Sequence, residues 1–224
     1  MKIAICFRGV FGIRSILSKE KSISEITSCF EKTIENNKKL FLNEFIIPEN
    51  KVDYFFSTYS VNEGLDSYIA KKFNPIAYSF LDKKFMTYPD TWRPQFAQFK
   101  NLVDLVDEIQ YFKRENYDLL IFTRQDIKYQ LGYDSVDVDL DKFNIVFRHT
   151  SGNCDDGLWI FPIKYFEKFK KSIYELSSRS YAITHEINHL LEEMDVEINY
   201  MSEPDNGKTD VGCPFYTKNL LLNE

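Results

Sequence analysis

The chain has 224 residues, a formal net charge of −6 and only 8 glycines against 20 phenylalanines. This length fits one domain, and the acidic balance argues against a nucleic-acid backbone as the main partner, because such proteins need a basic surface. The patterns G-x-G-x-x-G and G-x-x-x-x-G-K-S/T do not occur in the sequence, which counts against a dinucleotide-binding Rossmann fingerprint and a P-loop NTPase.

The N-terminal part of the chain predicts alternating strands and helices. Apolar residues 3–7 predict a buried strand, and residues 8–14 then form a turn that contains two glycines and two arginines. The further elements expected here are a helix opened by the capping box Ser22-x-x-Glu25, a strand over 52–60, a helix over 62–73 and a short strand over 76–80.

The alternation continues toward the C-terminus. Pro94 begins the longest periodic segment, in which apolar residues from Phe96 to Phe112 recur at helical spacing. Residues 117–122 form a near-continuous apolar run, which is typical of an interior strand covered on both faces. The elements expected after it are an acidic loop over 134–141, a strand over 143–147, helices over 162–176 and 181–194, a strand over 196–201 and a polar tail over 202–224.

This order of elements predicts an α/β fold, a sandwich with a mostly parallel central sheet flanked by helices. We expect a single such domain over residues 1–201, followed by a polar C-terminal tail over 202–224. In sheets of this kind ligands bind beyond the carboxyl ends of the strands. Three charged segments follow expected strands and are therefore candidate sites: residues 8–14, 123–126 and 148–156.

The cysteine and hydropathy patterns bear on the compartment. Four cysteines form no C-x-x-C pair and no zinc-binding spacing, which is typical of reduced thiols in a cytosolic protein. The apolar stretch at residues 3–7 is too short for a signal peptide, and no stretch approaches the roughly 18 apolar residues of a membrane span. We therefore expect a cytoplasmic protein without a transmembrane segment.

The segment after the central expected strand pairs a cation with a carboxylate. Arg124 and Asp126 are two residues apart, which on a strand places both side chains on one face. An Asp at a strand end can give Mg²⁺ or Mn²⁺ one hard oxygen ligand, and an Arg beside it can bind phosphate oxygens in a forked geometry. The alternative is an ion pair at the surface.

The turn after the first expected strand suits a phosphate. Its glycines, Gly9 and Gly12, allow backbone N–H groups to approach a ligand closely, and its arginines, Arg8 and Arg14, add positive charge. The alternative is a tight turn with exposed arginines. Arg93, which precedes the long helix, is a further candidate for phosphate contact.

Paired acids stand in the third segment. Asp155 and Asp156 precede Gly157 and Trp159, so one carboxylate could act as a general base and the indole could support the face of a sugar. The alternative is a turn in which an Asp caps backbone groups and the Trp packs into the core.

A formal H-E-x-x-H pattern runs from His185 to His189, as in zinc metallopeptidases. On a regular helix both histidines fall opposite the apolar stripe that includes Ile187 and Leu191, on the face expected to be solvated. The helix context therefore argues against zinc binding, and the metallopeptidase is kept as a weaker alternative.

Taken together, these segments resemble nucleotide-sugar glycosyltransferases of the GT-A type. In a group of that family, a first strand ends in a Gly/Arg turn, a second reads D-x-F-x-x-T, a long helix precedes Y-D-x-x-I-x-x-R-x-D, and an Asp-rich turn with an aromatic residue follows. The matching segments here are residues 3–14, 53–58, 117–126 and 155–159, and the resemblance extends over about residues 1–176.

The resemblance implies a Rossmann-like GT-A domain that binds a nucleoside-diphosphate sugar, usually with Mn²⁺ or Mg²⁺. Asp126 would then contact the metal. Arg124 stands where the usual D-x-D pattern has its first Asp, a departure that bears on metal dependence. Residues expected to bind the nucleotide sugar are Arg8, Gly9, Arg14, Thr58, Arg93 and Arg124.

The expected reaction is sugar transfer from the nucleotide donor to a hydroxyl of a glycan or other acceptor. Asp156 or Asp155 would accept the proton of that hydroxyl if the anomeric centre is inverted. A non-catalytic sugar- or nucleotide-binding member of the same fold is the first alternative, because the first Asp of D-x-D is missing. Nucleic acid is not an expected partner, and no transmembrane segment is expected.

Overall fold

The structure is a computed structural model that describes residues 1–9, 24, 27, 31, 35, 43, 48–60, 63–82, 93–124, 127–129, 136–149, 151–179, 182–202 and 216–218. Two predicted site residues, Arg14 and Asp126, lie outside this set, and only the backbone of Arg93 belongs to it. Most of the helix expected after Ser22 also lies outside, although its described positions 24, 27, 31 and 35 are helical.

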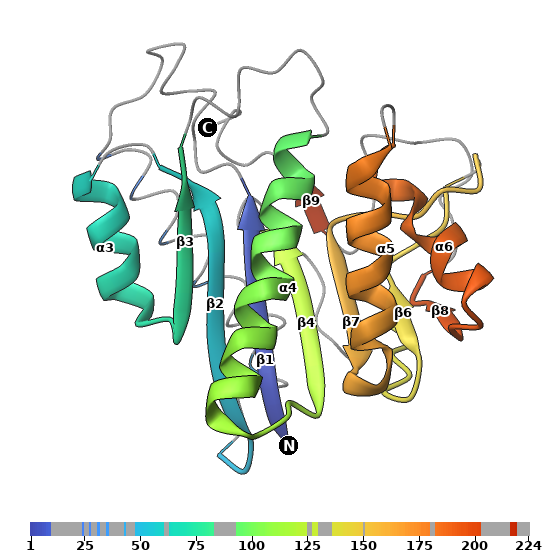
Figure 1. Ribbon diagram of the computed structural model, residues 1–224, viewed down its shortest axis with the longest axis horizontal. Coiled ribbons are helices and arrows are strands. Elements are labelled where there is room, and N and C mark those ends of the chain that lie inside the picture. The colour runs from blue at the N-terminus through green and yellow to red at the C-terminus, as the bar shows by residue number, and fades with distance from the viewer. Residues whose placement is uncertain are drawn as a thin grey trace.

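A seven-stranded sheet forms the centre of the molecule, with the strand order β3-β2-β1-β4-β7-β6-β8 (Figure 1). Two further short strands, β5 and β9, pair with each other apart from it. The strands are β1 (Lys2–Gly9), β2 (Lys51–Tyr59), β3 (Ala77–Leu81), β4 (Leu119–Arg124), β5 (Ile127–Tyr129), β6 (Phe143–Ile145), β7 (Leu158–Pro162), β8 (Ile198–Tyr200) and β9 (Tyr216–Lys218).

Parallel pairing joins β3, β2, β1 and β4, and also joins β6 to β8. Only β7 pairs antiparallel with both of its neighbours, β4 and β6, so it runs against the rest of this sheet. The prediction of an α/β fold with a mostly parallel sheet is thereby confirmed. The carboxyl ends of β1, β2 and β3 point to the top of Figure 1, and the start of β7 lies at that same edge.

Helices cover both faces of the sheet, and their bounds are α3 (Glu63–Phe73), α4 (Arg93–Lys113), α5 (Phe166–Ser178) and α6 (Ile187–Glu193), with 3-10 turns η4 (Ile163–Tyr165) and η5 (Thr184–Glu186). Side chains of α4, α5 and α6 share one buried cluster with alternate residues of the central strands. Side chains of α3 belong to a second cluster formed by the intervening strand residues. The sheet is therefore buried on both sides, as the continuous apolar strands predict.

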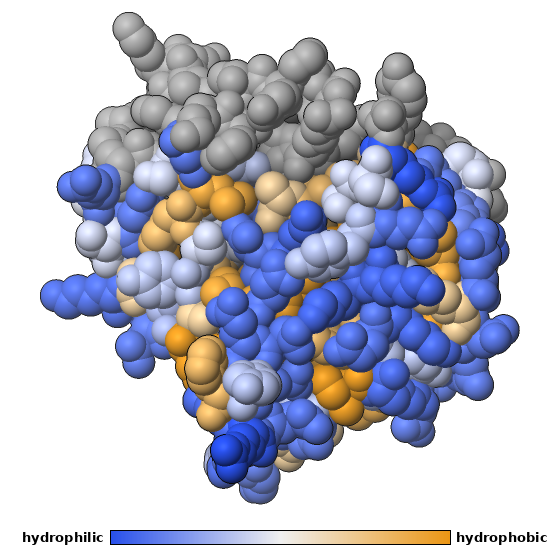
Figure 2. All heavy atoms as spheres, viewed as in Figure 1, coloured by the Kyte–Doolittle hydropathy of each residue, from blue (hydrophilic) through white to orange (hydrophobic). Residues whose placement is uncertain are grey.

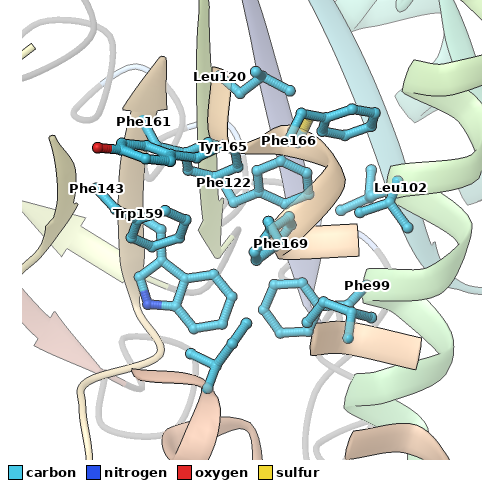
Figure 3. Close-up of a cluster of buried hydrophobic side chains, with 14 of the residues drawn as sticks. Phe99, Leu102, Leu120, Phe122, Phe143, Trp159, Phe161, Tyr165, Phe166 and Phe169 are labelled. Carbon is cyan, nitrogen blue, oxygen red and sulfur yellow. The ribbon is translucent and has the colours of Figure 1, made fainter. Parts of the chain in front are cut away.

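The larger cluster is built on aromatic rings (Figure 3). Phe99 of α4 stacks on Trp159 of β7 with ring centroids 4.7 Å apart, and Phe143 of β6 stacks on Phe161 of β7 at 4.4 Å. Trp159 has no exposed surface, so the expectation that its indole supports a sugar is wrong. It packs in the core, as the alternative interpretation of that segment holds.

The largest error of the sequence interpretation is the missing strand β7. No strand was expected over residues 158–161, and a helix was expected to begin at Pro162, because proline is favoured in the first turn of a helix. Pro162 is instead the last residue of β7, aligned with Leu119 of β4, and α5 begins only after the turn η4. Proline is tolerated at a strand end because it removes no interior ladder hydrogen bond.

Two smaller differences concern the ends of elements. Phe112 was placed on the buried stripe of the long helix, but 75% of its surface is exposed, because α4 extends past the edge of the core there. The tail after residue 202 was expected to be loop, yet its described part, Tyr216–Lys218, forms strand β9 against β5.

The outer surface of the α4–α5 face is mostly hydrophilic, with smaller apolar patches between the polar side chains (Figure 2). Within the described ranges, none of the helices combines the length and the apolar character that crossing a bilayer requires.

Candidate functional site

The sheet topology brings two arginines and an aspartate to one edge. Arg8 at the end of β1 is in register with Arg124 at the end of β4. Because β7 runs in the opposite direction, its first residue, Leu158, aligns with Thr123 of β4. Asp156, two residues before Leu158, therefore reaches the carboxyl edge at which the two arginine-bearing strands end.

The strand period decides which face these side chains occupy. Ala4 and Cys6 of β1 belong to the cluster beneath α4, while Ile5 and Phe7 belong to the opposite one. With a period of two residues, Arg8 projects to the α4 side, and its guanidinium lies 4.2 Å from the ring centroid of Phe99. Arg8 was expected in the turn after the first strand, with exposed arginines as the alternative, but it is the penultimate residue of β1 and only 2% of its surface is exposed.

A buried ion pair joins Arg8 to Asp156. Nη2 of Arg8 donates a hydrogen bond to Oδ2 of Asp156 at 3.0 Å and another to the backbone carbonyl of the same residue. The two side chains are 2% and 1% exposed. Ion pairs buried to this degree need hydrogen bonds to offset desolvation, and the two contacts of one guanidinium to one residue supply them.

Further polar groups surround the carboxylate of Asp156. Nη1 of Arg124 lies 3.6 Å from Oδ1, and the Arg124 side chain is 17% exposed. The hydroxyl of Thr184 lies 3.3 Å from Oδ2 and 2.9 Å from Oε1 of Gln95, so it links the carboxylate to the first turn of α4. Nε2 of His185 lies 3.8 Å from Oδ1.

The backbone at the end of β1 is held by two side chains. Oγ1 of Thr58 and Nε2 of Gln98 both donate to the carbonyl of Gly9, at 2.9 and 2.7 Å. Gly9 has φ of +145°, a conformation that glycine adopts without the strain a side chain would bring. Thr58, expected to bind the donor, is 1% exposed and here fixes the point at which the chain leaves β1.

Asp155 stabilises the turn before β7. Its Oδ2 accepts from the backbone N–H of Gly157 at 2.7 Å, and its carbonyl accepts from Nε1 of Trp159 at 2.8 Å. The residue has no exposed surface. This arrangement matches the alternative interpretation, a capping Asp next to a packed Trp.

The two histidines of the H-E-x-x-H pattern bind different groups. Nδ1 of His185 lies 2.7 Å from the carbonyl oxygen of Cys154, whereas Nε2 of His189 lies 3.1 Å from Oδ1 of Asn153. The expectation that both face solvent is wrong for His185, whose side chain is 18% exposed. Although the pattern is that of a zinc site, the ring nitrogens of the two histidines contact different oxygen atoms here.

A metal ion was also expected near Asp126. Among the residues that the structure describes, no group of three or more His, Cys, Asp or Glu side chains could hold a metal. At the described edge, Arg124 stands next to a carboxylate that Arg8 already binds. The described residues therefore do not build a metal site by themselves.

The sequence interpretation located Arg8, Arg124 and Asp156, which the structure brings together, and Gly9 and Thr58, which lie beside them. It missed the residues contributed by helices, namely Gln95, Gln98, Phe99, Thr184 and His185. The signal for Gln95, Gln98 and Phe99 was the long helix expected after Pro94. Because β3 ends at the carboxyl edge of the sheet, the first turns of the helix that follows it must lie near this edge. No local pattern points to Thr184, and the H-E-x-x-H pattern that contains His185 indicates a zinc ligand, not a neighbour of Asp156.

Comparison with known proteins supports the fold. No protein-family model matches the chain, and no curated protein does so. Among solved structures, it is similar to a protein of Desulfovibrio desulfuricans G20 provisionally named nucleotide-diphospho-sugar transferase, with 9% sequence identity and a TM-score of 0.51. The match covers 90% of this chain and 80% of that one. At this identity the likeness shows a common α/β fold alone.

Proposed function

We propose that the protein is a glycosyltransferase that transfers a sugar from a nucleoside-diphosphate sugar to a hydroxyl of a glycan acceptor. The observation that carries the proposal is the convergence of Arg8, Arg124 and Asp156 at the carboxyl edge of the sheet. In open α/β sheets this edge is where ligands bind. The fold likeness to a nucleotide-diphospho-sugar transferase supports the same reaction class.

The two arginines have different parts in this proposal. Arg8 is 2% exposed and bound to Asp156, so it acts as a positioning residue. Arg124 is more accessible, at 17%, and its forked guanidinium suits a diphosphate. Negative charge builds up on the diphosphate as the bond to the sugar breaks, and a preorganised cation lowers the barrier by stabilising that charge.

Three further residues of the predicted site have side chains that the structure does not describe. Arg14 and Arg93 would add contacts to the nucleotide, and Asp126 would contact Mn²⁺ or Mg²⁺, which when bound neutralises part of the diphosphate charge.

Donor binding tests the proposal directly. Thermal-shift and calorimetric titrations with UDP-glucose, UDP-galactose, UDP-N-acetylglucosamine and GDP-mannose, each with and without Mn²⁺, should reveal one preferred donor. We expect Arg124→Gln to raise the Kd of that donor about tenfold or more, which corresponds to about 1.4 kcal/mol. The matched control is Arg179→Gln, because Arg179 is 49% exposed and pairs with Glu175 on the surface of α5.

The same titration separates the alternatives. Saturable binding without turnover or donor hydrolysis would identify the non-catalytic binding protein. If no nucleotide sugar binds, or if both arginine variants bind the donor like the wild type, the proposal is wrong. For the metal, Asp126→Asn should abolish any Mn²⁺-dependent part of the donor affinity while leaving the affinity measured in EDTA unchanged.

A further inference from the structure

We propose that His185 accepts the proton of the attacking hydroxyl, and that Asp156 is the residue that positions it. This inference rests on the proposed function, because it concerns the transfer of a sugar to a hydroxyl. It replaces the expectation that Asp156 or Asp155 is the base, and it gives a chemical role to a histidine that the sequence pattern connects only with zinc.

The carboxylate of Asp156 is poorly placed to act as a base. Its Oδ2 accepts from Arg8 at 3.0 Å, Thr184 lies 3.3 Å from the same atom, and the side chain is 1% exposed. A carboxylate held by an arginine in this way favours its charged form, so it has little tendency to take a proton. Its burial also keeps a substrate hydroxyl from reaching it.

The imidazole of His185 is oriented by the backbone of the loop before β7. Nδ1 lies 2.7 Å from the carbonyl oxygen of Cys154, and because a carbonyl can only accept, Nδ1 carries the hydrogen. In the neutral imidazole the basic nitrogen is then Nε2. The backbone N–H of Cys154 also donates to the carbonyl of His185 at 2.7 Å, so two contacts fix this residue against the loop.

The basic nitrogen is on the side of the arginine–aspartate cluster. Nε2 lies 3.8 Å from Oδ1 of Asp156, close enough for the carboxylate to stabilise the imidazolium that forms when Nε2 takes a proton. The His185 side chain is 18% exposed, against 1% for Asp156. Of these two groups, the imidazole is therefore the one that a substrate hydroxyl can reach.

The charged and titratable groups around His185 come from several elements. Asp156 precedes β7, His149 follows β6 with its ring centroid 5.3 Å from that of His185, and Arg124 of β4 lies 3.6 Å from the same Oδ1 of Asp156. A general base acts through the lone pair of its basic nitrogen, which in this orientation is Nε2.

The proposed step balances as a single displacement. The hydroxyl oxygen forms a bond to C1 of the sugar, and the bond from C1 to the diphosphate oxygen breaks, with its electron pair leaving on the nucleoside diphosphate. The hydroxyl proton moves to Nε2 of His185 and is released to water after the product departs. Arg124 faces the developing charge of the leaving group, and Asp156 faces the imidazolium.

His185→Asn is the test variant, because an asparagine amide can keep the hydrogen bond that Nδ1 makes to the Cys154 carbonyl while removing Nε2. The matched control is His189→Gln, which changes the second histidine of the pattern and can keep its contact to Asn153. Because the acceptor is unidentified, the probe is hydrolysis of the preferred donor from the panel above, with water as the attacking hydroxyl.

For His185→Asn we expect kcat to fall by about 10²-fold or more, the donor Kd to change less than threefold, and the pH profile of kcat to differ from that of the wild type. His189→Gln should keep the wild-type kcat and pH profile. In His185→Ala, added imidazole should restore part of the turnover, which a residue of purely structural importance would not allow.

Two outcomes overturn the inference and are distinguishable. If His185→Asn keeps the wild-type kcat or pH profile while the wild type hydrolyses the donor, the proton goes elsewhere and only this inference fails. If the wild type binds no nucleotide sugar, the proposed function fails and the role of His185 fails with it.

Discussion

Arg8 and Asp156 are separated by 148 residues in the chain, yet Nη2 of the first lies 3.0 Å from Oδ2 of the second, and both side chains are almost completely buried. The pair joins the end of β1 to the loop that leads into β7. Its formation depends on the reversed direction of β7, which brings that loop to the edge where β1 and β4 end. The same contact therefore links the direction of β7 to the arrangement of charges at the candidate site.

Removing the carboxylate should destabilise the protein strongly. Asp156→Ala leaves the buried guanidinium of Arg8 without its anionic partner, and breaking such pairs typically costs about 3–5 kcal/mol. We expect the free energy of unfolding, measured by urea denaturation, to fall by about that amount.

A surface pair provides the control for this prediction. Glu175→Gln should cost less than about 1 kcal/mol, because its partner Arg179 is exposed. The double variant Arg8→Met/Asp156→Leu should recover much of the loss, since it leaves no buried charge unpaired. Equal stability of Asp156→Ala and the wild type would show that the pair contributes little to the fold.

The elements with strong periodicity were predictable, and β7 was not. The continuous apolar runs of β1 and β4 fit strands covered on both faces, and their neighbours in the sheet followed from the α/β alternation. In β7, the apolar residues Leu158–Phe161 end at Pro162, and a proline after a short apolar run is equally typical of a helix start. Pairing with two non-local strands decided between the two, and no local pattern carries that information.

The site residues at strand ends were predictable. The residues whose direction depends on the rotation per residue along a helix were not. Arg8 and Arg124 were found because parallel strands end at one edge. His185 was placed on a solvated face by assuming 100° per residue, but Thr184–Glu186 is a 3-10 turn, which rotates by about 120° per residue. The change of phase turns the imidazole toward the loop before β7.

The contrast between two phenylalanines of α4 tests the core. Phe99 has no exposed surface, stacks on Trp159 and lies beneath the guanidinium of Arg8. We expect Phe99→Ala to lower the free energy of unfolding by about 3–5 kcal/mol. Phe112, 75% exposed, is the control, and its change to Ala should stay within about 0.5 kcal/mol. If both variants lose a similar free energy of unfolding in urea denaturation, the finding that Phe112 lies outside the buried stripe of α4 is contradicted.

Two glycine substitutions should have opposite effects. Gly9→Ala places a side chain where φ is +145°, a strain of about 1–3 kcal/mol, and should lower the melting temperature. Gly64→Ala is on the exposed first turn of α3, where alanine is favoured over glycine by up to about 1 kcal/mol, and should raise it. A Gly9→Ala variant as stable as the wild type would mean that β1 leaves the sheet in another conformation.

The last prediction concerns alkaline stability and Tyr59, the final residue of β2. Burial raises the pKa of Tyr59 from 10.0 to about 12. The folded protein therefore keeps this phenol protonated at a pH where the unfolded chain has released the proton. Because the unfolded state then binds fewer protons, the free energy of unfolding should decrease as pH rises from about 10 to about 12. Tyr59→Phe should show a shallower decrease over this range, whereas Tyr111→Phe, at a position that is 81% exposed, should follow the wild type. Parallel curves for Tyr59→Phe and the wild type, measured by urea denaturation at each pH, would show that burial of Tyr59 does not govern this loss.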